Sequence, residues 1–194
     1  MSNPRQLAFD LEDNERSVDF QSLDKSDSSL FIKKKDAMTF SELPGLKILL
    51  DALNTERENF RNKLDTSWYA SPNSLGYWQK VYLSSEFDII TLYYKEEMIG
   101  FAVSYIPSNE KPHFWQDISY LYVVPEHRGK GYGKLLVNAL LSRDEFETRV
   151  WLRPEAKASI LFFENLGFEY LDETWRERIY IKKTKGISGS DSIA

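Results

Sequence analysis

The chain of 194 residues has no cysteine and only two histidines, His113 and His127. Without cysteine it has no disulfide, no zinc site with thiolate ligands and no cysteine nucleophile. Two histidines are too few for a histidine-rich metal centre, so we expect no metal cofactor. The absences exclude disulfide-stabilised scaffolds and thiol enzymes.

Long apolar runs are missing as well. No stretch of about 18 apolar residues occurs, and the N-terminal residues are polar rather than basic and then apolar. We therefore expect a soluble, cytoplasmic protein with no membrane partner. The net charge of −5 argues against nucleic-acid binding, which needs a basic surface. The charge is compatible with a cationic substrate such as an amine, or it simply maintains solubility.

The length and the 42% of hydrophobic residues suit one globular domain with its own core. Residues 1–35 are rich in Ser, Asp and Glu and predict a partly flexible N-terminal arm. Residues 36–184 are predicted to form the domain. The Gly- and Ser-rich residues 185–194 predict a disordered C-terminal tail.

Hydrophobic patterns predict the order of helices and strands. Apolar residues spaced by three and four predict helices over 46–64, 75–83, 135–141 and 155–166. Runs of β-branched and aromatic residues predict strands over 87–94, 98–105, 114–124, 148–152, 168–170 and 178–181, and a first strand before the basic triplet 33–35. Early hairpins followed by strands joined through helices predict an α/β fold, with a mixed sheet and helices on both faces.

The most informative stretch is residues 120–141, which read YLYVVPEHRGKGYGKLLVNALL. A strand ends at Pro125, a glycine-rich turn follows, and a helix with one apolar face begins near Lys134. The first turn of a helix presents backbone N–H groups and the positive end of its dipole, so it favours an anion. Alternate glycines allow a phosphate to approach those N–H groups, and Arg128, Lys130 and Lys134 add positive charge.

Spacing excludes two common nucleotide motifs. In a Walker A loop the lysine is followed by Ser or Thr, but Lys134 is followed by Leu135. A dinucleotide fingerprint starting at Gly129 would need its third glycine at Lys134. The run from Arg128 to Gly133 fits [R/Q]-x-x-G-x-[G/A] and resembles the acyl-CoA pyrophosphate loop of the GCN5-related N-acetyltransferase (GNAT) superfamily.

A second segment supports the same resemblance. Residues 156–168, AKASILFFENLGF, resemble the later helix of that family, with Phe162, Gly167 and Phe168 in step. The resemblance covers residues 87–183. It implies a mixed, mostly antiparallel twisted sheet with helices on both faces. It also implies an acetyl-CoA-dependent N-acetyltransferase that moves an acetyl group to a primary amine of a small molecule or protein.

The resemblance also implies where acetyl-CoA, the acyl donor, binds. Backbone N–H groups of the strand would pair with the pantetheine arm and polarise the thioester carbonyl, which involves Leu121, Tyr122 and Val123. The loop residues implied to hold the pyrophosphate are Arg128, Gly129, Lys130, Gly131, Tyr132, Gly133 and Lys134. For Tyr132, packing of the ring on the sheet edge is an alternative.

Asp117 matches the position of the family's strand-borne glutamate and is our candidate for the general base, acting through a water. Ser119 lies on the same strand face and would order that water. Glu126 and His113 are weaker candidates for the base. Alternatively, Asp117 is a solvated carboxylate at the end of the strand with no catalytic role.

Two positions depart from the family. Phe163 stands, next to the cofactor, where many relatives carry a tyrosine that protonates the departing thiolate, and Ala156 replaces a usual asparagine. A phenylalanine cannot donate a proton. Either the thiolate leaves unaided, or another hydroxyl such as Tyr170 or Tyr180 serves, or the chain is a catalytically weak acyl-CoA-binding or protein-interaction module.

The acceptor is not specified by any motif. Aromatic residues near the two helices that flank the acceptor site in the family are candidates for its pocket, with packing against the sheet as the alternative: Trp68, Tyr69, Tyr77, Trp78 and Tyr82. A role of the N-terminal arm in recruiting a partner and a homodimer both stay open.

Overall fold

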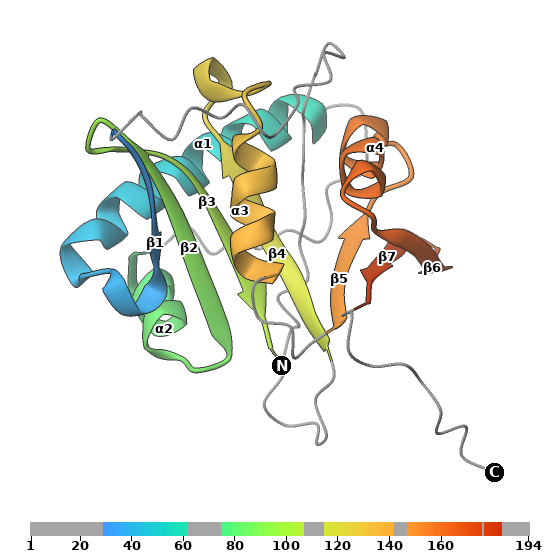
Figure 1. The fold of residues 1–194 in the computed structure, drawn as a ribbon, viewed down its shortest axis with the longest axis horizontal. Helices are drawn as coiled ribbons and strands as arrows, with labels where there is room; N and C mark the ends of the chain where they lie inside the picture. Colours follow the sequence, from blue (N-terminus) through green and yellow to red (C-terminus); the bar gives the residue numbers. More distant parts are fainter. Residues whose placement is uncertain (1–28, 62–74, 107–114, 142–146, 176, 184–194) are drawn as a thin grey trace.

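The computed structural model describes residues 29–61, 75–106, 115–141, 147–175 and 177–183. Its centre is a seven-stranded sheet in the order β1-β2-β3-β4-β5-β7-β6 (Figure 1). The strands are β1 Leu30–Lys34, β2 Phe87–Tyr94, β3 Glu97–Tyr105, β4 Trp115–Val123, β5 Glu147–Leu152, β6 Glu169–Glu173 and β7 Arg178–Lys182. Neighbouring strands are antiparallel except β4 and β5, which are parallel.

Helices cover both faces of the sheet (Figure 1). They are α1 Leu43–Arg61, α2 Leu75–Leu83, α3 Tyr132–Leu141 and α4 Lys157–Asn165, with short 3-10 turns η2 Lys35–Ala37, η3 Phe40–Glu42 and η4 Pro125–His127. One core cluster joins α3 and α4 to the sheet, and a second joins α1 and α2 to the opposite face. Among the described residues, none of the helices has the length and apolar character that crossing a membrane requires.

The prediction of a mixed sheet with helices on both faces is confirmed. The predicted elements all form, with ends shifted by a few residues. Leu30–Lys34 fall in the stretch predicted as an arm, but they form β1 and pair with β2, so they belong to the sheet. The rest of the arm and the C-terminal tail lie outside the described residues. In α3 the structure buries Val137, whereas Leu135 is only half-buried.

Strand β4 contains an irregularity at Ser119. On β3, Val103 pairs with Tyr120 and Ser104 pairs with Ile118, so Ser119 has no partner of its own across this ladder. Such a bulge shifts the alternation of side chains along a strand. Ile118 and Leu121 consequently share the α3 side, while Tyr120 and Tyr122 lie on the α1 side. Asp117, one residue before Ile118, is thereby placed on the α1 side.

The basic triplet at the end of β1 has structural partners. Lys35 Nζ donates to the carbonyls of Ser84 and Phe87, the latter at 2.9 Å, and so satisfies backbone groups just after α2. Lys33 Nζ lies 2.8 Å from Glu42 Oε1. These contacts explain two of the three lysines without a nucleic-acid ligand.

Glu42 ties the start of α1 to the edge of the sheet. Its carboxylate accepts hydrogen bonds from Lys33 Nζ, from the Tyr93 hydroxyl and from the Thr39 N–H. Burial raises the pKa of Glu42, but these hydrogen bonds outweigh it and lower the pKa to about 2. The folded protein therefore favours the ionised carboxylate.

This cluster generates a pH prediction. Because the folded-state pKa of Glu42 is below its ordinary value of 4.5, its contribution to stability is present above about pH 4.5 and is lost as the pH falls towards 2. The melting temperature of Glu42→Gln should lie below that of the wild type at pH 6, with the gap closing towards pH 2. Exposed Glu97→Gln is the matched control and should show no such trend. A gap that is equal at both ends of the range would contradict the assignment.

Candidate functional site

The glycine-rich turn between β4 and α3 contains two residues with positive φ. Gly129 has φ of 70° and Gly131 has φ of 80°, a region that side chains with a Cβ disfavour. The first helical hydrogen bond runs from Leu135 N–H to the Gly131 carbonyl. The N–H groups of Tyr132, Gly133 and Lys134 therefore precede the helical ladder and point out of the N-terminus of α3.

Strand β4 has an open edge just before this turn. Its pairing with β5 ends where Ile118 lies opposite Val150, although β4 continues to Val123. Val124 N–H donates to the Ile99 carbonyl of β3, so the alternation of a strand directs the N–H groups of Leu121 and Val123 away from β3. The edge offers backbone donors and acceptors to an extended ligand in the place of a neighbouring strand.

Arg128 points back into the protein. Its Nε donates to the Val123 carbonyl at 2.9 Å, and one terminal nitrogen (NH2) contacts both oxygens of Glu56 on α1 at 2.9 and 2.7 Å. The guanidinium also lies over the Tyr122 ring. Arg128 therefore braces the turn from inside the protein, and the expected contact of its charge with a phosphate stays a prediction. Lys130, which is exposed, bonds the Glu126 carbonyl at 3.0 Å.

The Tyr132 ring packs against the core and against His127, with ring centroids 6.0 Å apart. His127 in turn contacts Tyr94 of β2 at 5.3 Å. These contacts favour the alternative role given for Tyr132, a ring packed at the sheet edge. They leave its backbone N–H in the first turn of α3.

Asp117 and Ser119 lie on β4, beside the point where β5 separates from it. Asp117 is 8% exposed, and its Oδ1 accepts a hydrogen bond from Trp151 Nε1 at 3.2 Å. Across the parallel ladder Asp117 is the register partner of Arg149, whose guanidinium stacks over the Trp115 ring at 4.6 Å. Ser119 occupies the bulge and is buried. The sheet thus brings Asp117 and Ser119 to the start of the open edge.

Helix α4 approaches the same turn from the other side. Phe163 is 0% exposed and packs edge-on against Phe162 and Phe168. Phe162 is half-buried, and its ring would be 3.3 Å from a Cβ built on Gly133. Gly133 thus lies in close contact with α4, where a Cβ would crowd the Phe162 ring, while Phe163 is part of the core.

Two of the remaining catalytic candidates, Tyr170 and Tyr180, are not brought to this place, whereas Glu126 lies within the turn itself. Tyr170 is 53% exposed on β6, the sheet's edge strand, and β7 and β5 separate it from β4. Tyr180 is buried in the core, and Glu126 is exposed in η4. His113 lies outside the described residues.

Of the aromatic acceptor candidates, Trp78 is 0% exposed and packs against Phe101 and Tyr120, so it belongs to the core. The Tyr82 hydroxyl donates to the Met38 carbonyl at 2.8 Å. For both, the contacts support packing against the sheet. Trp68, Tyr69 and the Tyr77 side chain lie outside the described residues.

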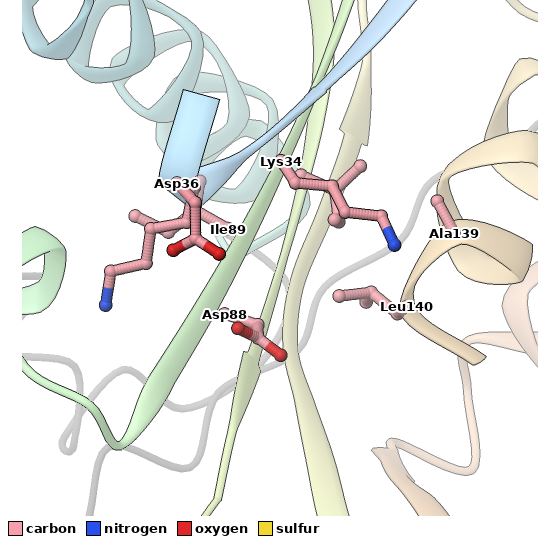
Figure 2. A pocket seen from close by; sticks show the side chains of 8 residues that line it. Lys34, Asp36, Asp88, Ile89, Ala139 and Leu140 are labelled. Atoms are coloured by element: carbon pink, nitrogen blue, oxygen red, sulfur yellow. The ribbon is translucent and has the colours of Figure 1, made fainter. Parts of the chain in front are cut away.

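A polar pocket lies at the other end of α3. Figure 2 shows Lys34, Asp36 and Asp88 around it, with Ala139 and Leu140 from the last turn of the helix. The glycine-rich loop that forms the candidate site leads into the opposite, N-terminal end of α3. The pocket is therefore separate from the candidate site.

Sequence reasoning missed Glu56. It was expected only as one charged residue of an amphipathic helix, yet it reaches both Arg128 and the Tyr122 hydroxyl, the latter at 2.8 Å. It is 72 residues from Arg128 in the chain. No local spacing signals such a contact.

Comparison with known families gives one match. Residues 50–168 match the model of the acetyltransferase (GNAT) family. No curated protein sequence is significantly similar to the chain.

Several solved structures share the fold. The chain is similar to PaiA N-acetyltransferase from Thermoplasma acidophilum in complex with coenzyme A, at 19% identity and a TM-score of 0.62, over 80% of this chain and 99% of that one. It is similar to Naa50 of Arabidopsis thaliana in complex with the bisubstrate analogue CoA-Ac-MVNAL, at 20% identity and 0.56, over 80% and 99%. It is also similar to a mutant of the spermidine N-acetyltransferase SpeG from Vibrio cholerae, at 14% identity and 0.56, over 80% and 94%.

The turn generates a stability prediction. Gly131→Ala should destabilise the protein by about 1–2 kcal/mol, because alanine must adopt the left-handed conformation there. Gly45→Ala in α1 is the matched control, since its Cβ would meet Met98 at an ordinary 3.5 Å and alanine favours a helix. Urea unfolding measures both. Equal free energies of unfolding for the two variants would show that the turn does not need glycine.

Proposed function

Because the chain belongs to the acetyltransferase (GNAT) family, we propose that it is an enzyme that transfers an acetyl group from acetyl-CoA to a primary amine of a small molecule or a protein. One arrangement carries the proposal: the open edge of β4 leads directly into the positive-φ turn and the N-terminus of α3. An extended ligand with an anionic end fits this sequence of backbone donors.

In this proposal the pantetheine arm pairs with β4 along Leu121, Tyr122 and Val123, and the pyrophosphate lies over Gly129–Lys134. Leu121 and Val123 direct N–H groups to the open edge, and one of them would polarise the thioester carbonyl in the transition state. Lys130 and Lys134 would add charge beside the phosphates. The coenzyme A complex of PaiA, a structure with the same fold, supports this role.

Asp117 is proposed to accept the proton of the amine, through a water ordered with Ser119. An amine with a pKa of about 10.4 must lose a proton to attack, which costs about 4.6 kcal/mol at pH 7. The Trp151 indole holds one carboxylate oxygen of Asp117.

Phe163 cannot donate a proton, and its ring is fully buried in the core beneath the proposed cofactor site. Since Tyr170 lies at the far edge of the sheet, the thiolate would depart without an enzymatic acid. The same observation favours a second function: a module that binds acyl-CoA and turns it over slowly or not at all. The acceptor class stays open between small amines and peptides.

Binding of acetyl-CoA tests the proposed function directly. Calorimetric titration of the wild type with acetyl-CoA should give saturable binding in the micromolar range, and Gly131→Glu should abolish it, because a carboxylate would occupy the phosphate position. Gly45→Ala, in the first turn of α1, should bind as the wild type does.

A thiol-release screen over polyamines, amino acids and peptides with free N-termini then separates the two functions. Coenzyme A release that depends on one added amine establishes the transferase. Binding without any amine-dependent release supports the acyl-CoA module, and no binding by the wild type contradicts both.

Substitution of Asp117 tests its proposed role as the base. Asp117→Asn should lower kcat by about 100-fold or more, because the variant cannot accept the amine proton. The loss should shrink at higher pH, where more of the amine is already neutral. Asp172→Asn on the exposed strand β6 is the matched control and should keep the wild-type rate. An unchanged rate and pH profile for Asp117→Asn would leave Asp117 as a structural carboxylate.

A further inference from the structure

Glu56 connects three parts of the candidate site. From α1, its Oε1 accepts the hydroxyl of Tyr122 on β4 at 2.8 Å, and both its oxygens contact Arg128 at the start of the glycine-rich turn. Burial and the Glu56 carboxylate raise the pKa of Tyr122, so the phenol stays protonated and continues to donate to Glu56. One carboxylate therefore joins a helix, a strand and a turn.

The contact differs from an ordinary surface ion pair. The Arg128 and Glu56 side chains are 18% and 28% exposed, and Arg128 also contacts the Val123 carbonyl and the Tyr122 ring. Exposed pairs contribute little because water screens them and their side chains lose entropy. Here the partly buried guanidinium is held from several directions, so its geometry is fixed by the protein.

We propose that Glu56 is a positioning residue of the acetyl-CoA site: by holding Arg128 and Tyr122 it keeps the turn at residues 124–131 in the conformation that receives the pyrophosphate. The inference deepens the proposed function and rests on it for the identity of the ligand. Glu56 acts through Arg128 and does not touch the cofactor. In this arrangement Arg128 supports the conformation of the turn, and the phosphates are recognised by the backbone N–H groups and by Lys130 and Lys134.

The two possible roles of Arg128 predict opposite signs for one substitution. If Arg128 were a phosphate ligand restrained by Glu56, then Glu56→Gln would release a cation towards the pyrophosphate and tighten binding. If Glu56 positions the turn through Arg128, the same substitution loosens the turn and weakens binding. We expect the dissociation constant for acetyl-CoA to rise about fivefold or more in Glu56→Gln.

Kinetics and a double-mutant cycle sharpen the test. KM for acetyl-CoA should rise with the dissociation constant while kcat changes by less than about twofold, because the reacting groups are untouched. Arg128→Met should weaken binding similarly, and Glu56→Gln combined with Arg128→Met should be no worse than Arg128→Met alone, since the two residues act as one unit. Tighter binding, unchanged binding or additive losses would each overturn the proposal.

A measurement without ligand separates this inference from the proposed function. Hydrogen exchange of the free protein should be faster at residues 126–135 in Glu56→Gln, with β2 and β3 exchanging as in the wild type. Asp51→Asn, which removes the partly exposed ion pair with Lys47 at an earlier turn of α1, is the matched control and should change neither region. Unchanged exchange at the turn would overturn the positioning role even if the chain binds acetyl-CoA. Faster exchange in Glu56→Gln, when the wild type binds no acetyl-CoA, would keep the positioning role and refute the proposed ligand.

Discussion

The site depends on a parallel strand pair that stops early. β4 is paired with β3 to its end, but β5 accompanies it only to Ile118. Beyond that point the backbone of β4 has hydrogen-bonding groups on one side that no described strand uses, and such a polar edge favours an extended ligand. The turn and the N-terminus of α3 follow directly, so the same short segment supplies both the strand-like edge and the anion site.

Much of the fold was predictable because its signals are local. The hairpin of β2 and β3, the buried strand β4 and the helix after the glycine-rich turn each have a hydrophobic period and turn residues within a few positions. The turn itself was predictable for the same reason: Gly129 and Gly131 occur where positive φ is required. Family membership followed from these residues in their order, and the match over 50–168 supports it.

The partners of charged and aromatic side chains were not predictable. The contact of Arg128 with Glu56 depends on how α1 crosses the sheet. Trp78 and Tyr82 were candidates for the acceptor pocket. In the fold Trp78 packs in the core and the Tyr82 hydroxyl donates to the Met38 carbonyl, and neither contact follows from the local sequence. The order of strands in a sheet cannot be deduced from local sequence patterns. The distance of the candidate acid Tyr170 from β4 was therefore not predictable: β7 and β5 lie between its strand, β6, and β4. Such long-range contacts arise from topology.

The bulge at Ser119 determines which side chains of β4 lie on each face of the sheet. A strand repeats every two residues, so in an unbroken β4 Asp117 would share a face with Leu121 and Val123, under α3. The extra residue puts the carboxylate on the α1 side while Leu121 and Val123 keep the α3 core filled. One inserted residue therefore changes the face on which residue 117 lies, which no substitution at Asp117 could do. In evolutionary terms, a single codon gained or lost at this position would transfer the carboxylate from one face of the sheet to the other and move the reactive face of the strand as a unit.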